Sequence, residues 1–166
     1  TTPTQEEVTD YNGDNGYVYD QEYNLKTYSE FFTLTGYTFK GWATSADGSV
    51  DLTNIGKDGS IERNGGTGTY ANLIKDGAKF KNVVTNNTVF RLYAIWEANT
   101  YTVAFNPNGG TGTMNSIAGN KFDVADHGEL PDNLFERTGY TFEGWATSAN
   151  GLVSFYSDAY YDTVGG

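Results

Sequence analysis

The fold is decided by a stretch of 19 residues that occurs twice in the chain. Residues 32–50 read FTLTGYTFKGWATSADGSV and residues 135–153 read FERTGYTFEGWATSANGLV, so 14 of 19 positions are identical at an offset of 103. A fainter match, at an offset of 81, relates residues 78–83 to residues 159–164. The difference between these offsets predicts an insertion of about 22 residues in the first copy, between Asp51 and Lys75. The sequence therefore predicts two copies of one module rather than a single domain.

The shared octapeptide TGYTFxGW predicts a β-strand that contributes to an aromatic core. Tyr37 and Phe39 point to one face of such a strand, and a bulge at Gly41 would return Trp42 to that face. Gly36 would supply the tight turn that leads into the strand. The corresponding residues of the second copy are Gly139, Tyr140, Phe142, Gly144 and Trp145.

Two further strands are predicted where the first copy ends and the second begins. Residues 89–96 are apolar at nearly every position, which predicts a central strand covered on both faces. Residues 101–105 alternate as a half-buried strand would, and a turn follows them. The repeat pattern favours a handover from one module to the next over a hairpin between these strands. The evidence for helix is thin and is confined to residues 28–32 and 126–136.

The composition excludes several classes of protein. The chain has 166 residues, no Cys and a net charge of −11. The lack of Cys excludes disulfide-stapled scaffolds and cysteine metal sites, and the acidic charge argues against a nucleic acid partner. No run of residues is long and apolar enough for a membrane-spanning helix, so the chain is not expected to insert into a membrane. Its 13 Tyr, 10 Phe and 3 Trp supply the aromatic content of a folded core.

Few residues qualify as candidates for catalysis or metal binding. His127 is the single histidine, and no Cys, second His or GxSxG motif accompanies it to form a triad or a zinc site. Asp10, Asn12 and Asp14 occupy positions 1, 3 and 5 of a calcium-loop pattern, but the glycine and the bidentate acid of that pattern are out of register. A turn rich in Asn, Asp and Gly is therefore the favoured interpretation. We expect no catalytic activity and no cofactor.

These motifs together resemble the Listeria/Bacteroides surface repeat, also called the internalin-type B-repeat. The resemblance rests on the two TGYTFxGW copies, on the turn Asn108-Gly109-Gly110, and on the expected strand Leu92-Tyr93-Ala94-Ile95-Trp96. It implies a β-rich α+β fold of small β-grasp-like (ubiquitin-like) modules in tandem, in secreted or cell-wall-anchored bacterial proteins. Such modules generally act as stalks or contribute to adhesion, and the family has no catalytic residues to carry over.

The domain organisation follows from the repeat. A first module is expected over residues 8–98, with an insertion near residues 51–75, and a second module over residues 99–166. The second copy stops before any counterpart of residues 89–96, so it is expected to be truncated at its C-terminal side and to expose an unpaired sheet edge. Either the chain is a fragment, or the structural unit is a permutation of the sequence repeat. The fragment is favoured.

The predicted function is that of a non-catalytic extracellular module, a stalk, spacer or adhesion element of a bacterial cell-surface protein. Its expected partners are neighbouring repeats and an unidentified host or bacterial surface protein or glycan. The alternative is a carbohydrate-binding module with a flat row of exposed rings. The candidate rings are Tyr17, Tyr19, Tyr23 and Tyr28, or Tyr156, Tyr160 and Tyr161. An isopeptide crosslink between Lys and Asn is a third possibility, for which the sequence selects no pair.

Overall fold

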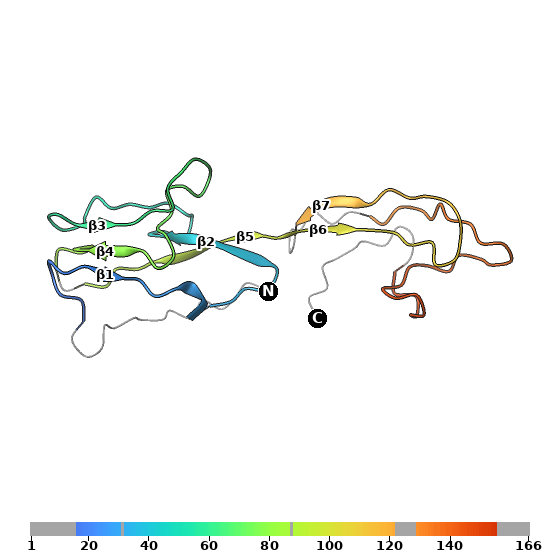
Figure 1. Ribbon diagram of the computed structural model, residues 1–166, viewed down its shortest axis with the longest axis horizontal. Coiled ribbons are helices and arrows are strands. Elements are labelled where there is room, and N and C mark those ends of the chain that lie inside the picture. Colours follow the sequence, from blue (N-terminus) through green and yellow to red (C-terminus); the bar gives the residue numbers. More distant parts are fainter. Residues whose placement is uncertain (1–15, 31, 87, 122–128, 156–166) are drawn as a thin grey trace. The chain divides into compact units, whose positions relative to one another are not determined.

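The computed structural model describes residues 16–30, 32–86, 88–121 and 129–155 of the chain (Figure 1). Within these ranges the structure consists of short β-strands and one 3₁₀ turn, η2, at Tyr28–Glu30. The expected β-rich class is therefore confirmed. The calcium candidates Asp10, Asn12 and Asp14 lie outside the described residues, as does His127. By its internal contacts the chain divides into unit 1, Thr1–Glu97, and unit 2, Ala98–Gly166.

Unit 1 contains two small sheets. The first has three antiparallel strands in the order β1 (Tyr23–Asn24), β4 (Lys79–Lys81) and β3 (Ser60–Ile61). The register places Tyr23 and Ile61 opposite Phe80, one on each side of β4. The second sheet pairs β2 (Tyr37–Ala43) with β5 (Tyr93–Ala98). The first copy of the repeated motif is therefore a strand, as its sequence predicts.

The core of unit 1 joins residues from both sheets. Trp42 of β2, Ile61 of β3 and Phe80 of β4 are buried in one cluster with Ile74, which is fully buried. The Trp42 amide donates to the carbonyl of Ile74 over 2.9 Å, and the Ile74 amide donates to the carbonyl of Trp42 over 2.8 Å. Ile61 belongs to the predicted insertion, so this segment contributes to the core as well as to the surface.

Unit 2 is held together by fewer strands among its described residues. Its sheet pairs β6 (Thr100–Val103) with β7 (Ile117–Lys121) in antiparallel fashion. Two isolated bridges connect the remaining segments, Thr111 with Glu136 and Trp145 with Phe155. Leu130, 5% exposed, is the buried hydrophobic residue among those described in this unit. Unit 2 thus has a smaller core than unit 1 in the part of the chain that is described.

The strand predicted over residues 89–96 differs from the observed one. β5 begins at Tyr93, belongs to a sheet of two strands and is half-buried, and Val89 is 57% exposed. The prediction of a central strand covered on both faces is therefore wrong. The apolar side chains of β5 are partly covered, as in the contact of Trp96 with Phe39. β5 pairs with β2 and β6 pairs with β7, so these two strands do not form a hairpin with each other, as the repeat pattern predicted.

Candidate functional site

The repeated motif builds an aromatic cluster in unit 1. The ring of Phe39 lies 5.0 Å from that of Trp42 and 5.3 Å from that of Trp96, edge to face in both pairs. Tyr28 stacks on Phe39 with the ring centroids 4.3 Å apart. Phe32 approaches Trp42 from a further direction at 6.3 Å. The rings of β2 thus contact those of η2, of β5 and of the segment that precedes the motif.

The second motif reproduces part of this cluster in unit 2. Phe142 and Trp145 lie 4.9 Å apart with an interplanar angle of 66°, the angle that Phe39 and Trp42 also make. Phe135 approaches Trp145 at 6.1 Å, as Phe32 approaches Trp42. Phe105 adds a contact with Trp145 at 4.9 Å. Identical sequence therefore gives nearly identical local packing.

Both tryptophans also form the same backbone bridge. Trp42 pairs with Ile74 in unit 1, and Trp145 pairs with Phe155 in unit 2. The step from Trp42 to Trp145 equals the larger offset of the sequence repeat, and the step from Ile74 to Phe155 equals the smaller one. In unit 2 the Trp145 amide donates to the carbonyl of Phe155 over 2.7 Å. The bridge is the point at which the two halves of the repeat meet.

The glycine before each tryptophan is required by the bridge. Gly41 has φ +141° and Gly144 has φ +147°, backbone conformations that favour glycine. A Cβ atom on Gly41 would lie 2.9 Å from the carbonyl oxygen of Ile74, and one on Gly144 would lie 2.7 Å from that of Phe155. Any side chain at either position would therefore press on the bridge.

The glycines at the start of each motif lie in equivalent turns. Gly36 has φ +81° and Gly139 has φ +79°. The Tyr37 amide donates to the carbonyl of Leu34 over 3.2 Å, and the Tyr140 amide makes the same turn contact in unit 2 over 3.0 Å. A tight turn therefore leads into each copy of the motif.

The two copies differ in what covers them. In unit 1, β5 pairs with β2, and Tyr37 and Phe39 are half-buried. In unit 2, Tyr140 is 67% exposed and Phe142 is 40% exposed. Within the described part of the chain, the backbone between Tyr140 and Trp145 makes no hydrogen bond to another strand. We call residues 140–145 the unit 2 edge.

The two copies of the motif also differ in charge at one position. In unit 1, Lys40 on β2 forms an ion pair with Glu97 on β5 at 2.6 Å, and the hydrogen bond to Glu97 raises the pKa of Lys40. The Tyr70 hydroxyl donates to Glu97 over 3.2 Å. The residue of the unit 2 edge that corresponds to Lys40 is Glu143, which is exposed. The position that pairs β2 with its neighbour is thus basic in unit 1 and acidic in unit 2.

The indole N–H of each motif is left without an acceptor. Among the described residues, Nε1 of Trp42 and Nε1 of Trp145 are buried side-chain nitrogens that donate no hydrogen bond. A buried donor without an acceptor costs about 1 to 3 kcal/mol. The close packing of rings around each tryptophan therefore has to offset this loss.

The tyrosines proposed for a sugar platform do not form a flat row. Tyr17 meets Tyr23 at an interplanar angle of 77° and Phe80 at 72°, so the rings contact edge to face. The Tyr19 hydroxyl donates to the carbonyl of Lys57. Tyr28 packs against Phe39, as described above. The other candidates, Tyr156, Tyr160 and Tyr161, lie outside the described residues.

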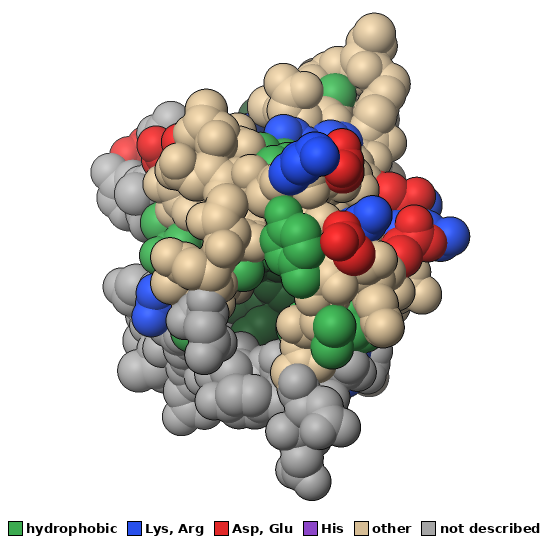
Figure 2. Space-filling model, turned by 90° about the vertical axis from the view of Figure 1, so that its left-hand side faces the viewer, with side chains coloured by type: hydrophobic (Ala, Val, Ile, Leu, Met, Phe, Trp, Pro, Cys, Tyr) green, Lys and Arg blue, Asp and Glu red, His purple; other side chains and the backbone are tan. Residues whose placement is uncertain are grey.

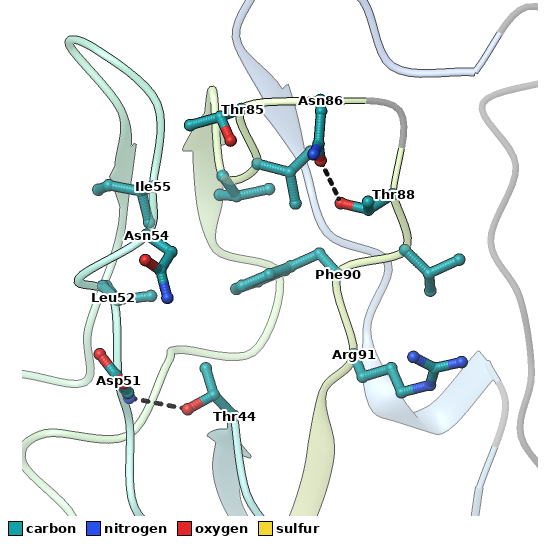
Figure 3. A pocket seen from close by; sticks show the side chains of 13 residues that line it. Thr44, Asp51, Leu52, Asn54, Ile55, Thr85, Asn86, Thr88, Phe90 and Arg91 are labelled. Atoms are coloured by element: carbon teal, nitrogen blue, oxygen red, sulfur yellow. Dashed lines mark hydrogen bonds between the residues drawn. The ribbon is translucent and has the colours of Figure 1, made fainter.

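A pocket of about 440 Å³ opens beside the predicted insertion (Figure 3). The ring of Phe90 points into it, and Asp51 and Arg91 are the charged residues among those that line it. The Asp51 carboxylate accepts the Thr53 amide over 2.8 Å, a hydrogen bond that lowers the pKa of Asp51. The Asp51 amide in turn donates to the Thr44 hydroxyl. Asp51 therefore serves the local turn, and the described residues that line the pocket place no acid–base pair in it.

The charged side chains of unit 1 are intermixed rather than separated by sign. Figure 2 shows one face on which Lys and Arg side chains lie next to Asp and Glu side chains. Lys79 forms an ion pair with Glu22 at 3.1 Å, and Lys81 approaches Asp20 at 3.7 Å. In the described ranges, no group of three or more His, Cys, Asp or Glu side chains converges as a metal site requires. This face therefore presents no continuous basic surface.

Comparison with known proteins identifies the repeat. A family model for the Listeria-Bacteroides repeat domain matches residues 7–64 and 101–164, one segment in each unit. A protein of Evansella cellulosilytica, described as a putative Gly-rich membrane protein, is 30% identical over 128 residues, a match that covers 77% of this chain and 11% of that relative. No solved structure matches the chain. Within the described residues no helix is long and apolar enough to span a membrane. The chain belongs to the Listeria-Bacteroides repeat domain family.

Proposed function

We propose that the chain is a pair of non-catalytic spacer modules from an extracellular bacterial surface protein. The observation that carries the proposal is the aromatic cluster with its glycine and its backbone bridge, built once in each unit. Stability in repeat proteins comes from units that are added one after another, so that length grows with copy number. A segment whose repeated residues are used for packing suits a spacer better than a catalytic domain.

The location and partners are part of the same proposal. The relative from Evansella cellulosilytica is described as a membrane protein, and this supports a place in the cell envelope for a protein that contains such repeats. The chain would then be secreted or anchored to the cell wall, with neighbouring repeats as its first partners and a surface protein or glycan as a partner of the whole protein. The finer arrangement that we propose is a tandem of β-grasp-like modules, which the β-rich structure supports.

The absence of a catalytic role is also proposed, on two grounds. The charged residues that line the described pocket are Asp51 and Arg91, and Asp51 is held by the turn at Thr53. The ion pairs of the described surface join single lysines to single carboxylates. General acid–base catalysis requires a titratable side chain that is free to exchange a proton with a bound substrate, and neither feature supplies one.

A display experiment tests the spacer role. One, two or three copies of the 166-residue chain are placed between a wall anchor and a peptide tag on the surface of a bacterium that has a thick polysaccharide layer. Antibody labelling of the tag should increase with each added copy. A matched control replaces every copy with a Gly/Ser linker of equal residue number, which is more compact on average because it behaves as a random coil.

Two results would contradict the proposal. Labelling that does not increase with copy number, or that is equalled by the flexible linker, would remove the spacer role. Binding of the purified chain to defined sugars on a glycan array would favour the carbohydrate-binding alternative. In that case the exposed rings of unit 2 would be the first residues to substitute.

A further inference from the structure

Two copies of the hexapeptide NGGTGT are held differently by the fold. Residues 64–69 lie in unit 1 and residues 108–113 lie in unit 2. Each copy begins with Asn followed by Gly, and the glycine has no side chain to keep its backbone nitrogen away from the Asn side chain. Because the two sequences are identical, their surroundings decide whether these two groups react with each other.

In unit 1 the groups that would react are already engaged. The side-chain amide of Asn64 donates to the carbonyl of Lys40 over 2.7 Å and to that of Tyr70 over 3.0 Å. The Gly65 amide, which would be the attacking group, donates to the carbonyl of Ala71 over 3.0 Å. Three hydrogen bonds therefore have to open before Asn64 can react.

In unit 2 the attacking group is available. Asn108 and Gly109 have φ +47° and +85°, as the two central residues of a type I′ turn do. The turn is closed by the Gly110 amide, which donates to the carbonyl of Pro107 over 2.9 Å, whereas the Gly109 amide donates no hydrogen bond within the described part of the chain. The side-chain amide of Asn108 donates to the carbonyl of Ala149 over 2.9 Å. Among the described contacts, one hydrogen bond thus restrains the reacting groups here, against three in unit 1.

A guanidinium group lies on the peptide bond between the two reacting residues of unit 2. Nη1 of Arg137 donates to the carbonyl oxygen of Asn108 over 3.3 Å. A Cβ atom on Gly109 would lie 3.6 Å from Cζ of Arg137, so the cation is also close to the Gly109 backbone. The guanidinium lies over the ring of Tyr140, 4.0 Å from its centroid, which helps to fix its position. A cation on this carbonyl stabilises the negative charge that the peptide group acquires when the Gly109 nitrogen gives up its proton.

We propose that Asn108 is a site of self-modification, at which its side-chain amide is converted to a carboxylate by attack of the Gly109 nitrogen. The nitrogen forms a bond to Cγ of Asn108, the bond from Cγ to Nδ2 breaks, and the proton of the Gly109 amide passes through water to the departing ammonia. Water then opens the five-membered succinimide ring and leaves Asp or isoaspartate at position 108. Water is the co-reactant that the conversion needs, and the attack is favoured because both groups belong to one turn. Arg137 acts through the peptide group and is a positioning residue.

The product changes what the turn contacts. A carboxylate cannot donate a hydrogen bond to the carbonyl of Ala149, so the contact between this turn and the turn at residues 148–151 is lost. The new negative charge is placed next to the Arg137 guanidinium instead. Unit 2 thereby loses a long-range contact, and refolding does not restore it. This modification is independent of the spacer role.

Incubation of the full chain in neutral buffer tests the proposal, with Asn64 as an internal reference. Peptide mapping by mass spectrometry at successive times follows the replacement of NH₂ by OH at each asparagine. Asn108 should be modified about tenfold faster than Asn64, because two fewer hydrogen bonds have to open. In concentrated urea both residues should react at similar rates, since the two hexapeptides are identical and no fold distinguishes them.

Substitutions at position 137 test the role of the guanidinium. Unit 1 carries Leu34 at the corresponding position, so Arg137→Leu is compatible with the fold of the motif. This variant should slow the modification of Asn108 about fivefold, the effect of one exposed interaction with a charge, and Arg137→Lys should restore most of the rate. If Arg137 only held the turn in place, its loss would loosen the turn and make the reaction faster. The direction of the change therefore separates the two roles.

Three results would overturn the proposal. Modification of Asn64 as fast as that of Asn108 in the folded chain would show that the different surroundings do not control the reaction. If Asn108 of the folded chain is unmodified when both residues of the urea-unfolded chain have reacted, the turn protects Asn108 and there is no such site. An unchanged or increased rate in Arg137→Leu would remove the role of Arg137.

Discussion

Replacement of Gly41 by Ala tests whether the bridge at Trp42 is what requires a glycine. The φ of +141° is unfavourable for any residue with a Cβ atom and costs about 1 to 3 kcal/mol. The new Cβ would also lie 2.9 Å from the carbonyl oxygen of Ile74 and 2.9 Å from Cβ of Leu73. Both neighbours are buried and cannot move aside, so overpacking adds about 1 to 3 kcal/mol. The total expected loss in the free energy of unfolding is about 2 to 6 kcal/mol.

Gly68 provides the matched control for this substitution. It has φ +125°, close to that of Gly41, but a Cβ atom added there meets nothing within 4 Å. Gly68→Ala should therefore show the backbone strain alone, about 1 to 3 kcal/mol. The difference between the two variants, about 2 kcal/mol, measures the close approach of Gly41 to the bridge.

The assay has to report on unit 1 alone, because a chain with two compact units does not unfold as one cooperative step. Guanidinium unfolding in a Trp145→Phe background meets this need, since the remaining Trp42 and Trp96 both lie in unit 1. Native-state hydrogen exchange of the Ile74 amide gives a second reading, because this amide donates to Trp42. If Gly41→Ala and Gly68→Ala cost the same within about 0.5 kcal/mol, the close approach is not what requires glycine and the reasoning is refuted.

Three further predictions concern burial and pH. Trp42→Ala should lower the free energy of unfolding in urea by about 3 to 5 kcal/mol, because Trp42 is 6% exposed. Trp145→Ala should lower it by about half as much, because Trp145 is only half-buried. Equal losses for the two variants would contradict this prediction. Asn82, 8% exposed, bonds through its side chain to the backbone and carboxylate of Asp20 and to a carbonyl, so its replacement by Ala should cost about 2 to 4 kcal/mol in thermal unfolding. The carboxylate of Asp47 accepts the amide of Ser49, which lowers the pKa of Asp47 in the folded state. Its contribution to stability is therefore fully present above the ordinary pKa of Asp, about 4, and is lost as the pH falls below that value through the lowered pKa of the folded state. Asp47→Asn should reduce the acid dependence of the urea midpoint.

The repeat made the best-predicted part of the structure accessible from sequence. The offset of 103 related Trp42 to Trp145, and in the structure each of these tryptophans forms a backbone bridge, with Ile74 and with Phe155. Such a prediction works because local packing around a Gly-Trp pair depends on residues that both copies share. The contact of Trp42 with Ile74 was not predicted, because Ile74 falls within the segment between Asp51 and Lys75 that the offsets assign to an insertion.

The sheet of β1, β4 and β3 could not be predicted in the same way. Its strands are two or three residues long, too short for an alternating pattern to stand out. The cluster around Asn82 joins that residue to Asp20 across 62 positions of the sequence, and no local signal marks either partner. Short strands and long-range polar contacts are determined by tertiary packing, which a single sequence does not display.

The different exposure of the two motifs could likewise not be predicted from the residues of the motif itself. Tyr37 and Tyr140 lie in the same octapeptide, yet one is half-buried and the other is 67% exposed. The cause is β5, which begins at Tyr93, far along the chain from the end of β2 at Ala43.

The two bridges also close chain loops of very different length, which has a consequence for the order of folding. The loop from Trp42 to Ile74 is about three times as long as the loop from Trp145 to Phe155. The entropy of loop closure makes the longer loop less favourable by about 1 kcal/mol. The hairpin-like contact of unit 2 should therefore form early in folding, before its counterpart. The insertion brings Ile61 into the core of unit 1. Because the same insertion lengthens the loop, it also delays formation of the bridge between Trp42 and Ile74.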